Sequence, residues 1–392
     1  MRSCFPGYLP KSEKDFDLLW ENGIFVFDTN ILLNMYRYSR ETQNVFFTIL
    51  DRIKERVWLP HQVVKEFFKN RIKVITDQDK LYKTIIDEMK FDAIKNQLNQ
   101  YKDRHVAIKI SNILEIIEKT EKDIKRELNK SKNEDIDYLK NDVVLEKLLI
   151  FFDGRVGKPY NDESLNGLYK EAQNRYKHKI PPGYKDEAKE EPEKYNDFII
   201  WSQIIEYAKG NHTNIILVTD DNKEDWWQPK YEGKTIGPRL ELLDEVYKKA
   251  GMHCHIYNTR TFLDVAKTKF VAILEGTLVD TAIGEVESVN KNSIAESSIK
   301  DLNALGYSLE DMRKIINELL RSGSGSFSTM DVVEKLTGKY HVGDPINRTI
   351  GVILSELQED IFSIVPDGRI SCLDNRGRNT TSACWKRPDN KE

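Results

Sequence analysis

Short, continuous apolar runs recur along the first two thirds of the chain, and two of them end in an acidic residue. The clearest runs lie at 23–28, 57–59, 214–220 and 253–257. Runs of this length without alternating polar positions are typical of strands that are buried on both faces. Segments with helical spacing lie at 39–54, after Pro60, at 195–208 and at 238–250. Strands that alternate with helices predict βαβ units around a mainly parallel central sheet, and thus an α/β fold.

A long helical insertion interrupts this alternation over about residues 77–153. It is rich in Lys, Glu, Ile and Leu, and its apolar residues recur at helical spacing, as at Ile113, Ile116, Ile117 and Ile124. This periodicity predicts two or three long helices. Two interpretations remain open, a solvated scaffold and an arm that grips a substrate. The turn-rich segment 180–186 then leads back to the sheet.

The pattern changes after about residue 271, so we assign a first domain to residues 1–271. Residues 272–307 are polar with few aromatic residues, which predicts a linker or an irregular segment. Residues 308–375 contain three helical patterns and an apparent hairpin of 361–365 and 369–373, which together predict a small winged-helix-like domain. The mildly basic tail, 376–392, is expected to be disordered.

The sequence does not determine whether the winged-helix-like domain binds DNA or another protein. Its third helical pattern, 345–358, contains Arg348 as its only basic residue and also carries Glu356. A strong DNA reader has more basic residues on this helix. The sequence is therefore compatible with DNA binding and equally with contacts to other proteins.

The amino-acid composition disfavours several classes of protein. The formal net charge of −4 gives no overall basic field, so a nucleic-acid partner would be held by local patches or by metal ions that bridge carboxylates and phosphates. The four cysteines form no CxxC pair, which disfavours a zinc ribbon and a disulfide framework. The chain lacks a signal-peptide pattern and an apolar stretch long enough to span a bilayer, so we expect a cytoplasmic protein without a membrane partner.

Two acids, Asp28 and Asp220, occupy the carboxyl ends of buried strands. In an open parallel sheet this edge is where ligands bind, and neighbouring strands would bring the two acids together. Two unpaired carboxylates about 4 Å apart repel by roughly 4 kcal/mol at an effective dielectric near 20. Mg²⁺ held by oxygen ligands is the simplest cation that would offset this cost.

Asp197 and Glu66 are less clear from the pattern alone. Asp197 lies on the apolar stripe of a predicted helix, with Ile200, Trp201 and Ile204, where an ionised acid is costly unless it has a partner. The alternative is that Asn196 or Asp197 merely caps the helix. Glu66 falls away from the apolar stripe of its own helix, so a solvent-facing side chain is the default expectation.

Five segments together resemble the PIN-like domain family, within the wider PIN and flap-nuclease group. They are FDTNILL at 27–33, LPHQVVKEF at 59–67, PGYKD at 182–186, NDFIIW at 196–201 and VTDDNKEDW at 218–226. Each is weak alone, but their joint order and spacing are specific. The resemblance covers most of residues 20–270 apart from the helical insertion. It implies a PIN-like three-layer α/β/α domain.

The resemblance also implies a set of metal-binding acids. Asp28, Glu66, Asp197 and Asp220 match the family's catalytic and metal-binding acids, and Asp221 and Asp225 match supporting metal positions. The family often has glycine before the helix aspartate, where this chain has Asn196. Two Mg²⁺ or Mn²⁺ ions are the implied cofactors.

The implied activity is that of a metal-dependent endonuclease. It would hydrolyse phosphodiester bonds in single-stranded nucleic acid, RNA in preference to DNA. Asn30 would help to orient Asp28 and line the substrate site, and Arg71 and Lys223 would contact substrate phosphates. The resemblance further suggests a toxin or anti-phage defence effector, restrained by a partner protein or by self-association through residues 308–375. The alternative is a non-catalytic nucleic-acid- or protein-binding regulator with an inactive site.

Overall fold

The computed structural model divides into two compact units, residues 1–283 and residues 284–392. It describes residues 5–9, 11–102, 104, 108–134, 136–229, 237–321, 326–338, 345–357, 362, 364–373 and 379–386.

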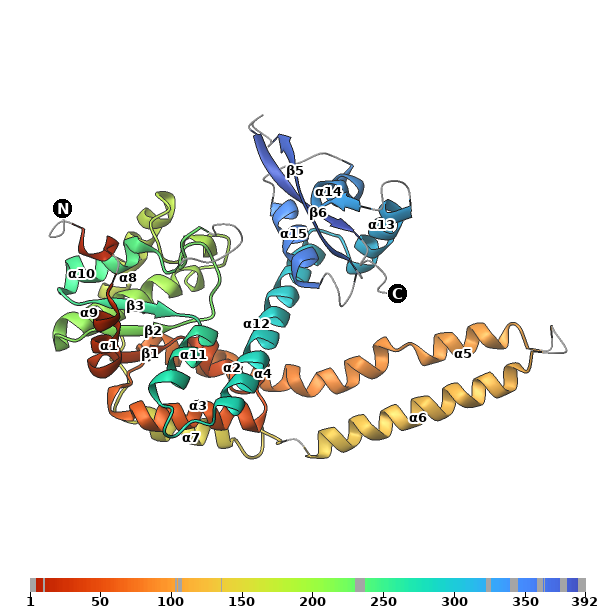
Figure 1. Ribbon diagram of the computed structural model, residues 1–392, viewed down its shortest axis with the longest axis horizontal. Helices are drawn as coiled ribbons and strands as arrows, with labels where there is room; N and C mark the ends of the chain where they lie inside the picture. The colour runs from red at the N-terminus through yellow and green to blue at the C-terminus, as the bar shows by residue number, and fades with distance from the viewer. Residues whose placement is uncertain are drawn as a thin grey trace. The chain divides into compact units, whose positions relative to one another are not determined.

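A parallel sheet lies at the centre of the first unit (Figure 1). Its strands are β1 (Ile24–Phe27), β2 (Ile215–Val218) and β3 (Cys254–Tyr257), in the order β1-β2-β3 among the described residues. Phe27 pairs with Val218, and Val218 pairs with Tyr257, so all three strands end at the same level. Residues that follow these strands, such as Asp28 and Thr219, therefore share one edge. The strands predicted at 23–28, 214–220 and 253–257 are confirmed, whereas the run at 57–59 forms only isolated bridges, Val57 with Phe25 and Leu59 with Val156.

Helices surround this sheet. They are α1 (Glu13–Asn22), α2 (Thr29–Asn34), α3 (Arg40–Ile53), α4 (His61–Glu88), α7 (Val143–Phe152), α8 (Asp162–Lys177), α9 (Asn196–Asn211), α10 (Leu240–Ala250) and α11 (Thr259–Lys269). The helices predicted after Ser39, after Pro60, around Asp197 and after Pro238 are confirmed. Over the ranges that the structure describes, no helix has both the length and the apolar character that a membrane span requires.

Both faces of the central sheet are covered. The rings of Phe25 and Phe27 on β1 contact Phe262 of α11, and Phe25 also contacts Trp20 of α1. Val26 points to the opposite face of the strand and is completely buried. Burial on both faces explains why β1 is a continuous apolar run, and it agrees with the expected three-layer α/β/α arrangement.

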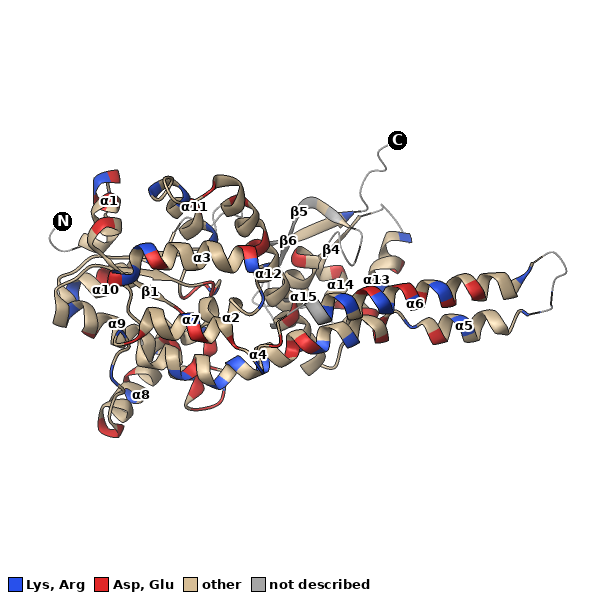
Figure 2. Cartoon of the chain, turned by 90° about the horizontal axis from the view of Figure 1, so that it is seen from below, with Lys and Arg blue, Asp and Glu red and all other residues tan. Residues whose placement is uncertain are grey.

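The insertion forms a pair of long helical segments. Helix α4 continues into α5 (Phe91–Asn99), and α6 (Ile110–Glu134) runs back beside them (Figure 1). Lys95 on α5 pairs with Glu121 on α6 at 2.9 Å. Lys and Arg alternate with Asp and Glu along these helices (Figure 2), as expected for helices with solvated faces.

The second unit is a helical domain with a small antiparallel sheet. Its elements are the end of α12 (Gly276–Ala304), α13 (Leu309–Arg321), β4 (Ser326–Ser328), α14 (Thr329–Thr337), α15 (Pro345–Leu357), β5 (Val365–Leu373) and β6 (Asn379–Lys386). The strand order is β4-β6-β5, and residues such as Met312, Val332, Ile350 and Leu354 form the core. Its winged-helix assignment stays a prediction.

Three details of the sequence interpretation are wrong in this region. Residues 272–307 are not irregular, because α12 covers most of them and buries Val279, Ile283 and Val286 at helical spacing. The segments 361–365 and 369–373 do not pair as a hairpin, because the residues between them form a bulge within β5, between Pro366 and Arg369. The return strand is β6, within the tail that we expected to be disordered; the rest of that tail, 376–378 and 387–392, lies outside the described residues. Its Trp385 is buried, and the indole N–H donates to Thr329 Oγ1 at 3.1 Å.

Candidate functional site: an acidic cluster at the carboxyl edge of the sheet

Asp28 follows β1 directly and begins α2 as its N-cap. Its Oδ1 accepts a hydrogen bond from the backbone N–H of Thr29 at 2.6 Å. Its Oδ2 accepts from Thr219 Oγ1 at 2.6 Å and from Asn30 Nδ2 at 2.7 Å. The segment after β2 therefore holds this carboxylate in place, as expected when adjacent parallel strands end together.

Asn30 connects the ends of β1 and β2. Besides Asp28, its Nδ2 donates to Thr219 Oγ1 at 3.2 Å, and its Oδ1 accepts from the backbone N–H of Asp220 at 3.1 Å. Both ends of the amide are thus used within the protein. The predicted orienting role of Asn30 agrees with this arrangement, because its hydrogen bonds fix Asp28 directly.

Asp220 and Asp221 are adjacent in sequence but make different contacts. Both oxygens of Asp220 bind Thr259 at the start of α11, Oδ1 to the backbone N–H at 3.0 Å and Oδ2 to Oγ1 at 2.7 Å. Asp221 instead accepts from Lys223, through the backbone N–H at 2.9 Å and through Nζ at 2.7 Å. The structure therefore places Asp221 in the acidic cluster and gives Asp220 a contact with α11.

Glu66 and Asp197 reach the same edge from α4 and α9. Gln62 joins these helices, because its Nε2 donates to Glu66 Oε1 at 3.2 Å and to Asn196 Oδ1 at 3.0 Å. The N-cap of α9 is Tyr195, and no side chain caps this helix. Capping therefore does not explain Asp197. Its Oδ2 is buried without a hydrogen-bond partner, and Lys223 Nζ lies 3.8 Å away.

Asp186 is the acid that the sequence analysis did not select. It lies in a 3-10 turn, Tyr184–Asp186, and only 7% of its side chain is exposed. Its Oδ1 is 2.9 Å from Lys223 Nζ, and its Oδ2 accepts from Lys189 Nζ at 2.6 Å. The segment PGYKD that carries Asp186 was part of the family resemblance, so a signal for this residue was present in the sequence.

Asp225 positions the turn that carries Asp186. Its Oδ2 accepts from the backbone N–H groups of Gly183 and Lys185, at 2.9 and 3.1 Å. Gly183 has a φ of 93°, and a Cβ there would lie 2.3 Å from the hydroxyl of Tyr176, so only glycine fits. Asp225 is fully buried and supports the site, whereas the sequence analysis placed it among the metal ligands.

Burial and mutual repulsion make these acids difficult to ionise together. Burial raises the pKa of Asp28, and the hydrogen bond from Thr219 offsets part of this rise. Burial, together with the carboxylate of Asp28, raises the pKa of Glu66 to about 7. Burial also raises the pKa of Asp197 well above its ordinary value, although the nearby Lys223 acts in the opposite direction. A bound cation would favour the ionised form of all three.

The predicted substrate-binding cations are both engaged with acids. Arg71 pairs with Asp142, whose carboxylate also accepts from the hydroxyl of Tyr36 at 3.0 Å. Lys223 lies within the acidic cluster, and burial lowers its pKa less than Asp197, Asp221 and Asp186 raise it. The nearby Trp226 and Trp227 are buried, with 2% and 8% of their surface exposed.

The carboxylates of the acidic cluster are suitable ligands for divalent cations, but they are not already arranged around a metal-binding position. In the described ranges, no three His, Cys, Asp or Glu side chains are grouped closely enough to hold a metal ion. The carboxylates are hard oxygen donors of the kind that Mg²⁺ and Mn²⁺ prefer. The unpartnered Oδ2 of Asp197 is a buried acceptor that such an ion would satisfy. The position among Asp186, Asp197 and Asp221 already holds a cation, the ammonium group of Lys223.

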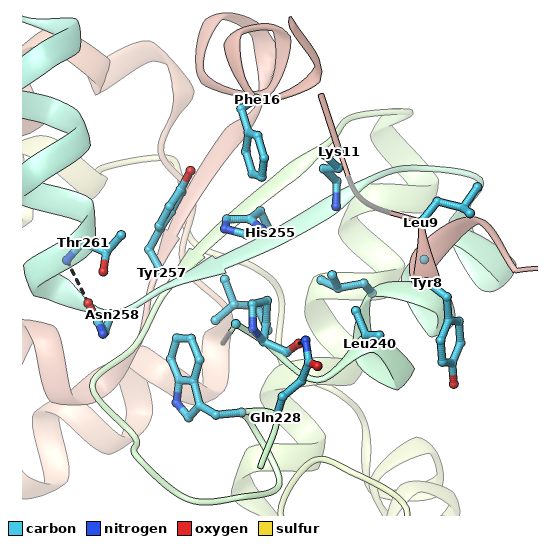
Figure 3. A pocket seen from close by; sticks show the side chains of 16 residues that line it. Tyr8, Leu9, Lys11, Phe16, Gln228, Leu240, His255, Tyr257, Asn258 and Thr261 are labelled. Atoms are coloured by element: carbon cyan, nitrogen blue, oxygen red, sulfur yellow. Dashed lines mark hydrogen bonds between the residues drawn. The ribbon is translucent and has the colours of Figure 1, made fainter. Parts of the chain in front are cut away.

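A separate cavity of about 580 Å³ lies beside β3 (Figure 3). Lys11, Phe16 and His255 line it, and Lys11 Nζ donates to the carbonyl oxygen of Cys254 at 3.1 Å. Of the described residues that line it, none is an acid of the cluster. The cavity is therefore distinct from the acidic cluster.

Comparison with known protein families shows what the chain is similar to. The family described as the PIN-like domain matches residues 24–242, which is more than half of the chain and includes every acid of the cluster. Comparison with curated proteins and with solved structures finds no match. The chain belongs to the PIN-like domain family.

Proposed function

We propose that this protein is a metal-dependent nuclease that hydrolyses phosphodiester bonds, with single-stranded RNA preferred over DNA. PIN-like domains are generally nucleases and bind nucleic acid, so the family supports the general class. The metal requirement, the endonucleolytic mode and the preference for RNA are our inference.

The acidic cluster is the observation that carries this proposal. Among the described residues, the cluster contains five carboxylates, those of Asp28, Glu66, Asp186, Asp197 and Asp221, which come from separate segments of the chain. Two ammonium groups, those of Lys189 and Lys223, are paired with them. Acids therefore exceed cations in a partly buried region at the ligand-binding edge of a parallel sheet. Divalent cations would offset the remaining charge.

The proposed roles follow from these contacts. Asp28, Glu66, Asp186, Asp197 and Asp221 would hold one or two Mg²⁺ or Mn²⁺ ions. When bound, these ions would supply Lewis-acid activation of the phosphate and of a water molecule. Asn30 and Thr219 orient Asp28, Gln62 orients Glu66, and Asp225 holds the turn of Asp186. In the metal-free protein the pKa of Glu66 is about 7, and a bound cation would lower it and keep this carboxylate ionised as a ligand.

The test is cleavage of labelled single-stranded RNA and DNA by the full chain with Mg²⁺, Mn²⁺ or EDTA. We expect metal-dependent cutting that Asp28→Asn abolishes and that Asp79→Asn, at an exposed position of α4, leaves unchanged. Cutting that persists in EDTA or in Asp28→Asn would refute the proposed mechanism. Absence of cutting with every substrate and ion would instead support a non-catalytic regulator. The defence role and the partner of residues 308–375 stay predictions.

A further inference from the structure

Lys223 lies among three carboxylates of the acidic cluster. Its ammonium group is 2.7 Å from Asp221 Oδ2, 2.9 Å from Asp186 Oδ1 and 3.8 Å from Asp197 Oδ2. These three carboxylates come from the end of β2, the turn after α8, and the start of α9. One flexible side chain thus contacts acids that three separate segments contribute.

We infer that Lys223 is a displaceable counter-ion, and that a divalent cation binds Asp186, Asp197 and Asp221 by taking the place of its ammonium group. This inference rests on the proposed function and specifies how the site acquires its metal. A carboxylate lone pair that accepts a hydrogen bond from Lys223 is not free to coordinate an ion. The ammonium and a divalent ion would also repel each other strongly within the same few ångströms. Lys223 must therefore leave when the ion enters.

The local structure allows this movement. Asp221 Oδ1 accepts from the backbone N–H of Lys223, which holds the main chain while leaving the side chain as the mobile part. The side chain of Lys223 is 34% exposed, so it has a route to solvent. Lysine carries its charge on a flexible four-carbon stem. Once displaced, the ammonium group would lie toward the solvent, where it can contact a phosphate of the substrate.

Calorimetric titration of Mn²⁺ into the substrate-free full chain tests the inference without any measurement of activity. Lys223→Gln removes the competing cation, so we expect it to bind Mn²⁺ at least tenfold more tightly than the wild type. Lys189→Gln is the matched control, because Lys189 also pairs with Asp186 but is 56% exposed and lies at the rim. We expect this control to change the affinity by no more than about twofold.

The outcomes separate this inference from the proposed function. Equal Mn²⁺ affinity in Lys223→Gln and wild type, or an equal gain in Lys189→Gln, would overturn the displacement and leave the metal site intact. No binding in any of the proteins would overturn both.

Acetylation of lysines in the wild type provides a measurement that does not depend on folding of a variant. We expect Mn²⁺ to increase labelling of Lys223 but not of exposed Lys209, and unchanged or reduced labelling of Lys223 would overturn the inference.

Discussion

Asp220 and Thr259 are joined by two hydrogen bonds that use both oxygens of the carboxylate. Oδ1 accepts from the backbone N–H at 3.0 Å, and Oδ2 accepts from Oγ1 at 2.7 Å. Thr259 is fully buried and is the first residue of α11. The acid that the sequence analysis placed among the metal ligands thus fastens the end of β2 to a helix, while its neighbour Asp221 faces Lys223.

This arrangement predicts different effects when each of the two neighbouring acids is replaced. Asp220→Asn should lower the free energy of unfolding by about 1–3 kcal/mol, because a charge-assisted pair of hydrogen bonds is weakened in a partly buried position. Asp221→Asn should lower Mn²⁺ affinity by about tenfold or more, because a charged ligand is lost. Urea unfolding in EDTA and Mn²⁺ calorimetry on both variants measure the two effects. A loss of Mn²⁺ affinity in Asp220→Asn alone would reverse our assignment.

The stability of the metal-free protein should depend on pH through Glu66. Its pKa is about 7 in the folded protein, against an ordinary value of 4.5. Between these values the unfolded chain releases the proton while the folded protein keeps it. The folded state therefore binds more protons, and its stability falls as pH rises from about 4.5 to about 7, by on the order of 3 kcal/mol.

Urea unfolding in EDTA across this pH range measures the effect of Glu66, and Glu66→Gln is the matched control without a titrating group. The difference in unfolding free energy between the two proteins should change across the window and level off at either end. Parallel curves for the two proteins would show that Glu66 has an ordinary pKa. Mn²⁺ should remove part of the fall, because it binds the ionised carboxylate.

Asn30 should be required for metal affinity even though it is not a proposed ligand. Its amide binds Asp28, Thr219 and the backbone of Asp220. Asn30→Ala should lower Mn²⁺ affinity by about 10–100-fold, the usual effect of removing a group that orients a ligand. Asn211→Ala is the matched control at an exposed helix end, and it should leave the affinity unchanged. Wild-type affinity in Asn30→Ala would mean that Thr29 and Thr219 suffice to orient Asp28.

Asp225 should stabilise the turn that carries Asp186. Replacing it by Ala leaves the backbone N–H groups of Gly183 and Lys185 without their acceptor, which should cost about 1–3 kcal/mol of unfolding free energy. Hydrogen exchange should become faster in the segment 183–189 beyond any global change. Asp264→Ala on the exposed face of α11 is the control. Exchange in this segment that rises no more than in the rest of the protein would show that other contacts hold the turn.

Much of the fold was predictable because the residues that strands and helices bury follow characteristic patterns along the sequence. The apolar runs of β1 and β2 predicted strands buried on both faces, and the position of Asp28 after such a run predicted its place at the sheet edge. The same reasoning failed for the tail, because a short polar strand such as β6 depends on the partner strand that it pairs with. Trp385 was the one residue there whose size indicated a buried position.

The sequence by itself determined the strands of the central sheet, several of the helices around it, the family and the presence of acids at the carboxyl edge of the sheet, because these depend on spacing along the chain. Only the tertiary structure decided which groups each acid contacts and thus its role. Asp220 and Asp221 follow the same strand, and their roles differ because Thr259, 39 residues away, supplies the hydrogen bonds that Asp220 accepts. Lys223 resembles any solvated lysine in sequence. It is a counter-ion because Asp186 and Asp197, from two distant segments, join its near neighbour Asp221 around its ammonium group. Such long-range contacts have no periodicity along the chain from which they can be inferred.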